Sequence, residues 1–265
     1  MTGIVTALTR YPIKGLSPET LHSIKLQQGQ GFSGDRSFAL ALPNTPFDSA
    51  NPKCLPKTLF LMLARQEALA RLHTRHDANS GMLHVRDGSI TLSASTQTSE
   101  GIAEIEAFFA QFLPVGQTDS RPRFVTAEDH SFTDVGVHSP ELMRAVSVIN
   151  LASVREFEAR VGRPIDPRRF RANILVDGLE PWEEMSWLER ELTIGSMRFR
   201  GARLTRRCPA TEVNPDTAVR DINVPKELIQ HYDHVFLGIY LFVLSDGELA
   251  VGDQLAPPMR GAGAI

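Results

Sequence analysis

The sequence predicts a β-rich α+β fold, and three observations indicate it. Short apolar runs bounded by turn residues recur along the 265-residue chain, as they do in strands. Only about three segments carry apolar side chains at helical spacing. Strands and helices do not alternate as they would in a doubly wound parallel sheet. We therefore expect a β-barrel-like fold with few helices.

The first hundred residues are predicted to consist mostly of strands. The apolar runs lie at Ile4–Leu8, Leu21–Leu26, Ser37–Leu42, Met82–Val85 and Ile90–Leu92. The last two runs flank Asp87-Gly88, a pair that is typical of a hairpin turn. Residues Glu100–Leu113 have helical spacing, and the Pro114 and Gly116 that follow are expected to stop the helix.

The segment Pro114–Pro122 is the best candidate for a domain boundary, because it is rich in proline, glycine and polar residues. We therefore expect an N-terminal β-barrel-like domain at residues 1–117, packed on a second β-barrel domain at residues 118–260.

The second domain is predicted to be mainly β-structure with two helices. Strands are expected at Val146–Leu151, Asn173–Val176 and, on either side of Gly195, within Glu191–Leu204; helices are expected at Ala152–Val161 and Pro225–His231. The runs Val235–Leu244 and Leu249–Val251 flank Asp246-Gly247, which indicates a second hairpin.

Composition excludes several classes of protein. The net charge is −3, which argues against general nucleic-acid binding because binding to phosphate backbones needs a sustained basic field. No signal peptide and no long apolar segment are visible, so we expect a cytoplasmic protein that does not bind a membrane. The two cysteines cannot hold an iron–sulfur cluster or a four-thiolate zinc ion.

Arginines cluster in two places within this acidic chain. The clusters are Arg163, Arg168, Arg169 and Arg171, then Arg198, Arg200, Arg203, Arg206 and Arg207. No acidic residue lies between Ser196 and Cys208. Because guanidinium groups bind phosphate or carboxylate through two parallel hydrogen bonds, the clusters favour a small anionic ligand.

Cys208 is the candidate for chemistry by a thiol. Arg206 and Arg207 precede it, and neighbouring positive charge favours the thiolate, which is a nucleophile and a soft metal ligand. The alternative, a small buried apolar residue, is the commoner role of a single cysteine. Cys54 lies in a proline-rich loop and is interpreted as an ordinary loop thiol. A cysteine hydrolase would need a histidine base, and the sequence indicates none.

Five segments, in order, carry a resemblance to a known family. They are YPIKGL, GDRSFAL, LARQEAL, RFRANILV and RCPATEVNPDT, and the resemblance runs from about Val5 to Leu255. The chain resembles the MOSC family, the molybdenum cofactor sulfurase C-terminal domain, together with its N-terminal β-barrel domain. Within that family it is similar to the mitochondrial amidoxime-reducing component and to bacterial members that reduce hydroxylated purines.

The resemblance implies a molybdenum cofactor, with Cys208 as catalytic residue and metal ligand beside the dithiolene of molybdopterin. It also implies that Lys14, Arg36, Arg171 and Asn173 hold the pterin and its phosphate; we add Arg206 and Arg207 to this cofactor-binding set. Arg65 and Asp216 match the pattern, with a scaffolding role at least as plausible. Gly15, Asn214 and Ala218 replace the serine, aspartate and glycine that relatives often carry, so altered contacts are expected.

The resemblance also implies a reaction, the reduction of hydroxylamines, amidoximes or hydroxylated purines to amines. Since the chain lacks cysteines for a cluster, electrons are expected from a separate protein of the ferredoxin, flavoprotein or cytochrome type. The alternative is a carrier of molybdenum cofactor or of cysteine-bound sulfur that catalyses no reduction.

Overall fold

The computed structural model describes residues 2–113 and 121–258. The strands are β1 (Gly3–Arg10), β2 (Glu19–Leu21), β3 (Ser23–Leu26), β4 (Phe38–Ala41), β5 (His73–Asp77), β6 (Met82–Asp87), β7 (Ile90–Ser95), β8 (Arg123–Thr126), β9 (Val146–Asn150), β10 (Ile174–Asp177), β11 (Glu191–Ile194), β12 (Met197–Arg206), β13 (Phe236–Val243), β14 (Gly247–Ala250) and β15 (Gln254–Ala256). The α-helices are α1 (Ser99–Phe109), α2 (Pro140–Met143), α3 (Leu151–Val161) and α4 (Val224–Tyr232). The predicted β-rich α+β fold is confirmed.

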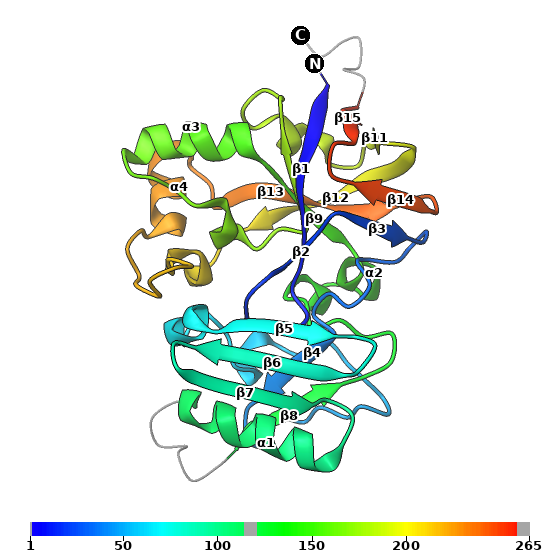
Figure 1. Cartoon of the computed structure of the whole chain (residues 1–265). Coiled ribbons are helices and arrows are strands. Elements are labelled where there is room, and N and C mark those ends of the chain that lie inside the picture. The colour runs from blue at the N-terminus through cyan, green and yellow to red at the C-terminus, as the bar shows by residue number, and fades with distance from the viewer. Residues whose placement is uncertain (1, 114–120, 259–265) are drawn as a thin grey trace.

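A closed barrel forms the larger of two bodies (Figure 1). Its seven strands follow the order β10-β9-β13-β12-β11-β15-β1, and β1 pairs back onto β10 to close the ring. Closure leaves no free edge among these strands, so their backbone groups are hydrogen-bonded on both sides. Strand residues such as Leu8 and Phe199 share one apolar core with Trp187 of the 3-10 turn Glu183–Trp187, and all three are fully buried.

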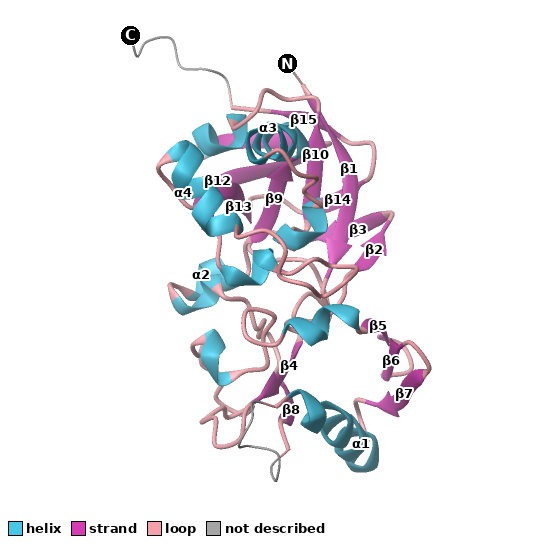
Figure 2. Cartoon of the chain, turned by 90° about the vertical axis from the view of Figure 1, so that its left-hand side faces the viewer, coloured by secondary structure: helices cyan, strands magenta, loops and turns pink. Residues whose placement is uncertain are grey.

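The smaller body lies beside the barrel and is clearly separate from it in Figure 2. It contains the meander β5-β6-β7 and the pair β4-β8. Helix α1 begins at the cap Thr98, whose side chain accepts a hydrogen bond from Gly101 N. Its buried face, with Ile105 and Phe109, joins Leu83 and Leu40 in a second apolar core.

Strand pairing crosses the predicted domain boundary in both directions. β1 completes the barrel and β3 pairs with β14, although both precede residue 117; β8 follows it and pairs with β4 of the smaller body. The boundary between residues 117 and 118 itself lies outside the described residues. Hydrogen bonds of the barrel thus recruit the first strand of the chain, and the division into domains at residues 1–117 and 118–260 stays a prediction.

The second predicted hairpin is wrong. β14 pairs with β3 and not with β13. Asp246 Oδ1 instead accepts a hydrogen bond from Gln28 N at 2.7 Å, and Gly29 N donates to Val243 O at 2.9 Å. These contacts turn the chain after β13 toward β3. The first hairpin is confirmed, since β6 and β7 pair on either side of Asp87-Gly88.

Two helices cover one side of the barrel (Figure 1). Asn150 caps α3 by accepting a hydrogen bond from Ala152 N, and Gly162, in the left-handed conformation with φ 71°, ends it. Phe157 of α3 and Leu228 of α4 share a third buried cluster. Within the described ranges no helix has the length and apolar character needed to span a bilayer.

Candidate functional site

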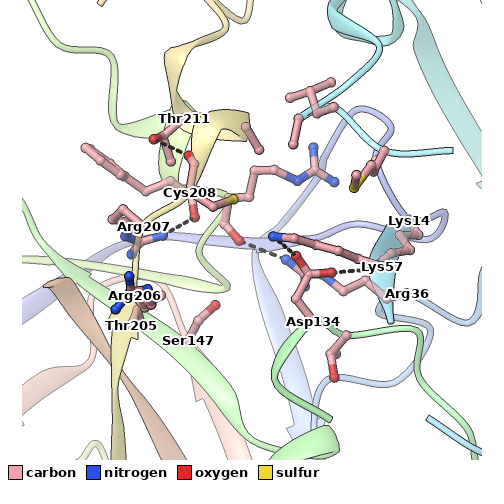
Figure 3. A pocket seen from close by; sticks show the side chains of 18 of the residues that line it. Lys14, Arg36, Lys57, Asp134, Ser147, Thr205, Arg206, Arg207, Cys208 and Thr211 are labelled. Carbon is pink, nitrogen blue, oxygen red and sulfur yellow. Dashed lines mark hydrogen bonds and ion pairs between the residues drawn. The ribbon is translucent and has the colours of Figure 1, made fainter. Parts of the chain in front are cut away.

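A cavity brings together every predicted site residue (Figure 3). It encloses about 1010 Å³, counting the part that is open to solvent. Barrel strands β9, β12 and β13 contribute to its wall, and residues 57–64 contribute from the smaller body. The predicted residues that line it are Lys14, Arg36, Arg171, Asn173, Arg206, Arg207 and Cys208.

Cys208 lies where β12 ends and the 3-10 turn Pro209–Glu212 begins. Its backbone is extended, with φ −137° and ψ 170°, as expected of a residue before a proline. Thr211 fixes its carbonyl, since the Thr211 N and Oγ1 atoms donate to Cys208 O at 3.0 and 2.8 Å. The half-buried side chain lines the cavity beside the arginine and lysine groups (Figure 3). Cys208 is therefore not a small apolar residue buried among aliphatic side chains, which was the alternative interpretation.

Lys14, Asp134 and Lys57 form an ion-pair network facing the thiol. Asp134 bridges the two ammonium groups, and its Oδ2 lies 3.1 Å from Lys57 Nζ. Lys14 Nζ also donates to Phe132 O at 3.0 Å. Burial alone would raise the pKa of Asp134, but the two lysines outweigh it and hold this pKa well below its usual range.

Lys57 is the ammonium group that faces Cys208. Burial by itself would lower the pKa of Lys57, but the Asp134 carboxylate and the Cys208 sulfur together raise it. Lys14 behaves differently, because burial lowers its pKa despite the Asp134 charge. A protonated Lys57 therefore stands next to the candidate metal ligand.

Arg36 and Arg171 clamp the ring of Tyr11. Their Cζ atoms lie 4.9 and 4.2 Å from the ring centroid, and Arg36 Nη2 donates to Arg171 O at 2.9 Å. Both arginines adopt left-handed backbone conformations, with φ of 53° and 54°. Such strain in residues other than glycine tends to occur at functional sites.

Three lining residues carry a buried side-chain atom that has no hydrogen-bond partner in the described part of the chain. The atoms are Arg171 Nη2, Thr205 Oγ1 and Arg169 Nε. Arg171 Nη1 donates to Leu16 O at 2.7 Å, whereas the buried Nη2 is left without a partner. Burial lowers the pKa of Arg171 to about 10. An unsatisfied buried donor is costly, and an anionic group such as a pterin phosphate would satisfy it; the cavity therefore fits the implied cofactor.

Asn173 and Arg207 contribute mainly to the frame of the cavity. Asn173 Oδ1 accepts hydrogen bonds from Ser147 N and Oγ, at 3.1 and 2.8 Å, and its Nδ2 donates to Thr9 O at 3.2 Å. Arg207 Nε and Nη1 donate to the carbonyls of Leu237 and Phe170. One amide N–H of Asn173 is left for a ligand, while the Arg207 side chain holds barrel and loop together.

The remaining arginines of the two predicted clusters take different positions. Arg206 is exposed and lines the cavity. Arg169 lines it too, but pairs with Asp221 at 2.6 Å. The cavity wall does not include Arg163, Arg168, Arg198, Arg200, Arg203, Arg65 or Asp216. Only part of each cluster therefore lines the cavity, since the alternating strand β12 directs several of its arginines away.

Sequence analysis missed several polar lining residues, among them Lys57, Asp134, Ser147, Thr205 and Tyr240. Ser147 and Tyr240 could have been predicted, because each is a polar residue within an apolar strand. In the fold they are cross-strand partners on β9 and β13. No signal marked Asp134, whose partners lie 77 and 120 residues away. Histidine is absent from the lining residues, so the base that a cysteine hydrolase needs is not supplied here.

The described residues offer no cluster of three or more histidine, cysteine, aspartate or glutamate side chains that could hold a metal. A metal ion bound at Cys208 would therefore take its other ligands from a cofactor. A thiolate is a suitable soft ligand for such a partnership.

Comparisons with known proteins find relatives of part of this chain. Residues 127–256 match the model of the MOSC domain. The bovine mitochondrial amidoxime reducing component 2 is 32% identical over 122 residues, 42% of this chain and 36% of its own length. The bovine molybdenum cofactor sulfurase is 33% identical over 98 residues, 35% of this chain and 11% of its own length. This chain thus spans about a third or less of these relatives.

Among solved structures, the YuaD protein from Bacillus subtilis is similar with a TM-score of 0.45 and 13% identity, covering 96% of this chain and 94% of that one.

The segment 127–256, which matches the MOSC model, contains the barrel strands from β9 to β15 and the candidate ligand Cys208. This chain therefore carries a MOSC domain at residues 127–256.

Proposed function

We propose that this chain binds molybdenum cofactor through Cys208 and reduces N-hydroxylated compounds to amines. The MOSC domain and its relatives indicate a function related to molybdenum cofactor. The observation that carries the proposal is the position of the Cys208 sulfur on the wall of a cation-lined cavity that contains an unpartnered arginine nitrogen.

Each side chain has a role in this proposal. The Cys208 thiolate would ligate the metal, and Arg171, Arg36 and Lys14 would neutralise the phosphate and orient the pterin. The bound cofactor would supply the two-electron redox chemistry. In the overall reaction the N–O bond breaks, two electrons and two protons are consumed, and an amine and water are formed.

Tyr240 is suited to orient the substrate. Its side chain lines the cavity, and burial raises its pKa, so the phenol stays protonated near neutral pH. A protonated phenol can donate a hydrogen bond to the substrate oxygen as the N–O bond breaks. Lys57 adds positive charge beside the same region.

The test is an anaerobic assay of protein purified from a host that makes molybdenum cofactor. Reduced methyl viologen supplies electrons, an aryl amidoxime is the substrate, and the amidine is quantified by chromatography. Wild type should form product, and Cys208→Ala should not. Cys54→Ala is the matched control, because Cys54 is not a lining residue. A Cys208→Ala variant that keeps full turnover would overturn the proposal.

One observation favours a second candidate, a carrier of molybdenum cofactor or of cysteine-bound sulfur. The chain is also similar to a molybdenum cofactor sulfurase. The same cavity would serve a carrier. Cofactor-loaded protein that forms no amine from a broad panel of hydroxylamines and amidoximes, but transfers cofactor to an acceptor enzyme, would favour the carrier.

A further inference from the structure

Strand β12 carries a row of four exposed arginines, Arg198, Arg200, Arg203 and Arg206, called the arginine row below. Its pairing with β13 is irregular between Gly201 and Arg203 and between Leu204 and Arg206. At the same places the spacing of the arginines lengthens from two residues to three. The strand thus keeps all four guanidinium groups in contact with solvent.

The arginine row has no ion pair and no side-chain hydrogen bond to any described residue, although Arg200 lies over the Phe242 ring at 5.6 Å. Glu191 stands opposite Arg200 in the β11–β12 register but makes no ion pair with it. Other arginines of this chain do pair with carboxylates: Arg10, Arg36, Arg71, Arg155, Arg160, Arg168, Arg169 and Arg220. Arg75 and Arg86 make no ion pair with a described residue either, so the arginine row differs in placing four such arginines on one strand of a chain whose net charge is −3.

The row leads to the cavity. Arg206 lines the cavity, and Arg203 is the cross-strand partner of Tyr240, which lines it too. The distance along the strand from Arg198 to Arg206 is about 26 Å at 3.3 Å per residue. That length is close to the width of a patch of about 800 Å², the area that one partner buries in a standard protein interface.

We propose that the arginine row is the docking surface for an acidic redox protein that delivers electrons to the site. This inference rests on the proposed reductase function. Per turnover two electrons are needed, which a one-electron donor such as a [2Fe–2S] ferredoxin supplies in two successive encounters; two protons come from solvent, the N–O bond breaks, and oxygen leaves as water. Complementary charge steers such encounters and fixes their orientation. A nucleic acid is a poorer fit, because four cations in an acidic chain do not make an extended basic field.

The test compares wild type with a triple charge reversal, Arg198→Glu/Arg200→Glu/Arg203→Glu, in the cofactor-loaded protein. Arg206 stays unchanged because it lines the cavity. The matched control reverses three exposed cations elsewhere, Arg75→Glu/Arg86→Glu/Lys226→Glu, and changes the net charge equally. The probe is an acidic [2Fe–2S] ferredoxin, and binding is measured by fluorescence anisotropy at about 0.01 M salt, where screening is weak.

Wild type should bind the ferredoxin, the row variant about tenfold or more weakly, and the control variant within about twofold of wild type. The kcat/KM for reduced ferredoxin should fall in the row variant and stay near the wild-type value in the control variant. Turnover with reduced methyl viologen should stay unchanged in both variants. Equal losses in both triple variants, no binding by wild type, or tighter binding to anionic vesicles or single-stranded DNA would overturn the inference. Binding needs no turnover, so a wild type that binds ferredoxin but reduces no substrate would refute the reductase function alone.

Discussion

Replacing Arg171 with methionine should weaken cofactor binding much more than it weakens the fold. Arg171 Nη2 is buried on the cavity wall without a partner in the described chain. Nη1 has one bond, to Leu16 O. A hydrogen bond to a charged group contributes about 1.5–3 kcal/mol. Loss of that bond to an anionic cofactor corresponds to a dissociation constant raised about 10- to 150-fold.

The assay for Arg171→Met is cofactor retention. Wild type and variant are purified from the same cofactor-competent host, dialysed, and analysed for molybdenum and released pterin per chain; thermal unfolding of the cofactor-free proteins is measured in parallel. The fold should change little, because loss of the Leu16 hydrogen bond is offset by removal of a buried charge whose pKa is already lowered to about 10. Wild-type retention by the variant would refute the role assigned to Nη2.

Other substitutions test other parts of the structure. Arg207→Met should destabilise the fold in urea unfolding by about 1–3 kcal/mol for each buried carbonyl that loses its hydrogen bond, those of Leu237 and Phe170; an unchanged midpoint would contradict this. Asp134→Asn should lower the free energy of unfolding by a constant amount at pH 5–8, because a carboxyl whose pKa is depressed in the folded state stabilises the fold above its unfolded pKa of about 3.9. The difference from wild type should shrink below about pH 4. A difference that grows toward low pH would refute the ion-pair network. Gly201→Ala should cost about 1–3 kcal/mol, because its Cβ would lie 2.0 Å from Trp187 O; calorimetry that shows a wild-type melting temperature would exclude this close packing.

Local sequence patterns predicted most strands and helices, because periodicity is encoded within each segment. Pairings between strands that lie far apart in the sequence were harder to predict. The turn residues Asp246-Gly247 predicted a hairpin, but β14 pairs with β3 from the start of the chain. His73 and His76 have helical spacing, yet they lie on strand β5, where residues three apart face opposite sides.

The residues of the candidate site also fall into two groups, those that the sequence predicted and those that only the folded chain brings together. The resemblance supplied five residues that line the cavity: Lys14, Arg36, Arg171, Asn173 and Cys208. It did not supply Lys57, because this lysine sits in a proline-rich loop and approaches Cys208 only when the two bodies pack. Nor did it predict Glu184, which is fully buried and whose carboxyl accepts a hydrogen bond from Ser153 Oγ at 2.7 Å.

X-ray absorption at the molybdenum edge tests the bond between the Cys208 sulfur and the metal most directly. The measurement compares wild type with Cys54→Ala and Cys208→Ala, each loaded with cofactor. We expect the first two to show the same sulfur coordination, and any metal retained by Cys208→Ala to have one sulfur neighbour fewer. Identical sulfur coordination in all three proteins would contradict the assignment of Cys208 as the metal ligand.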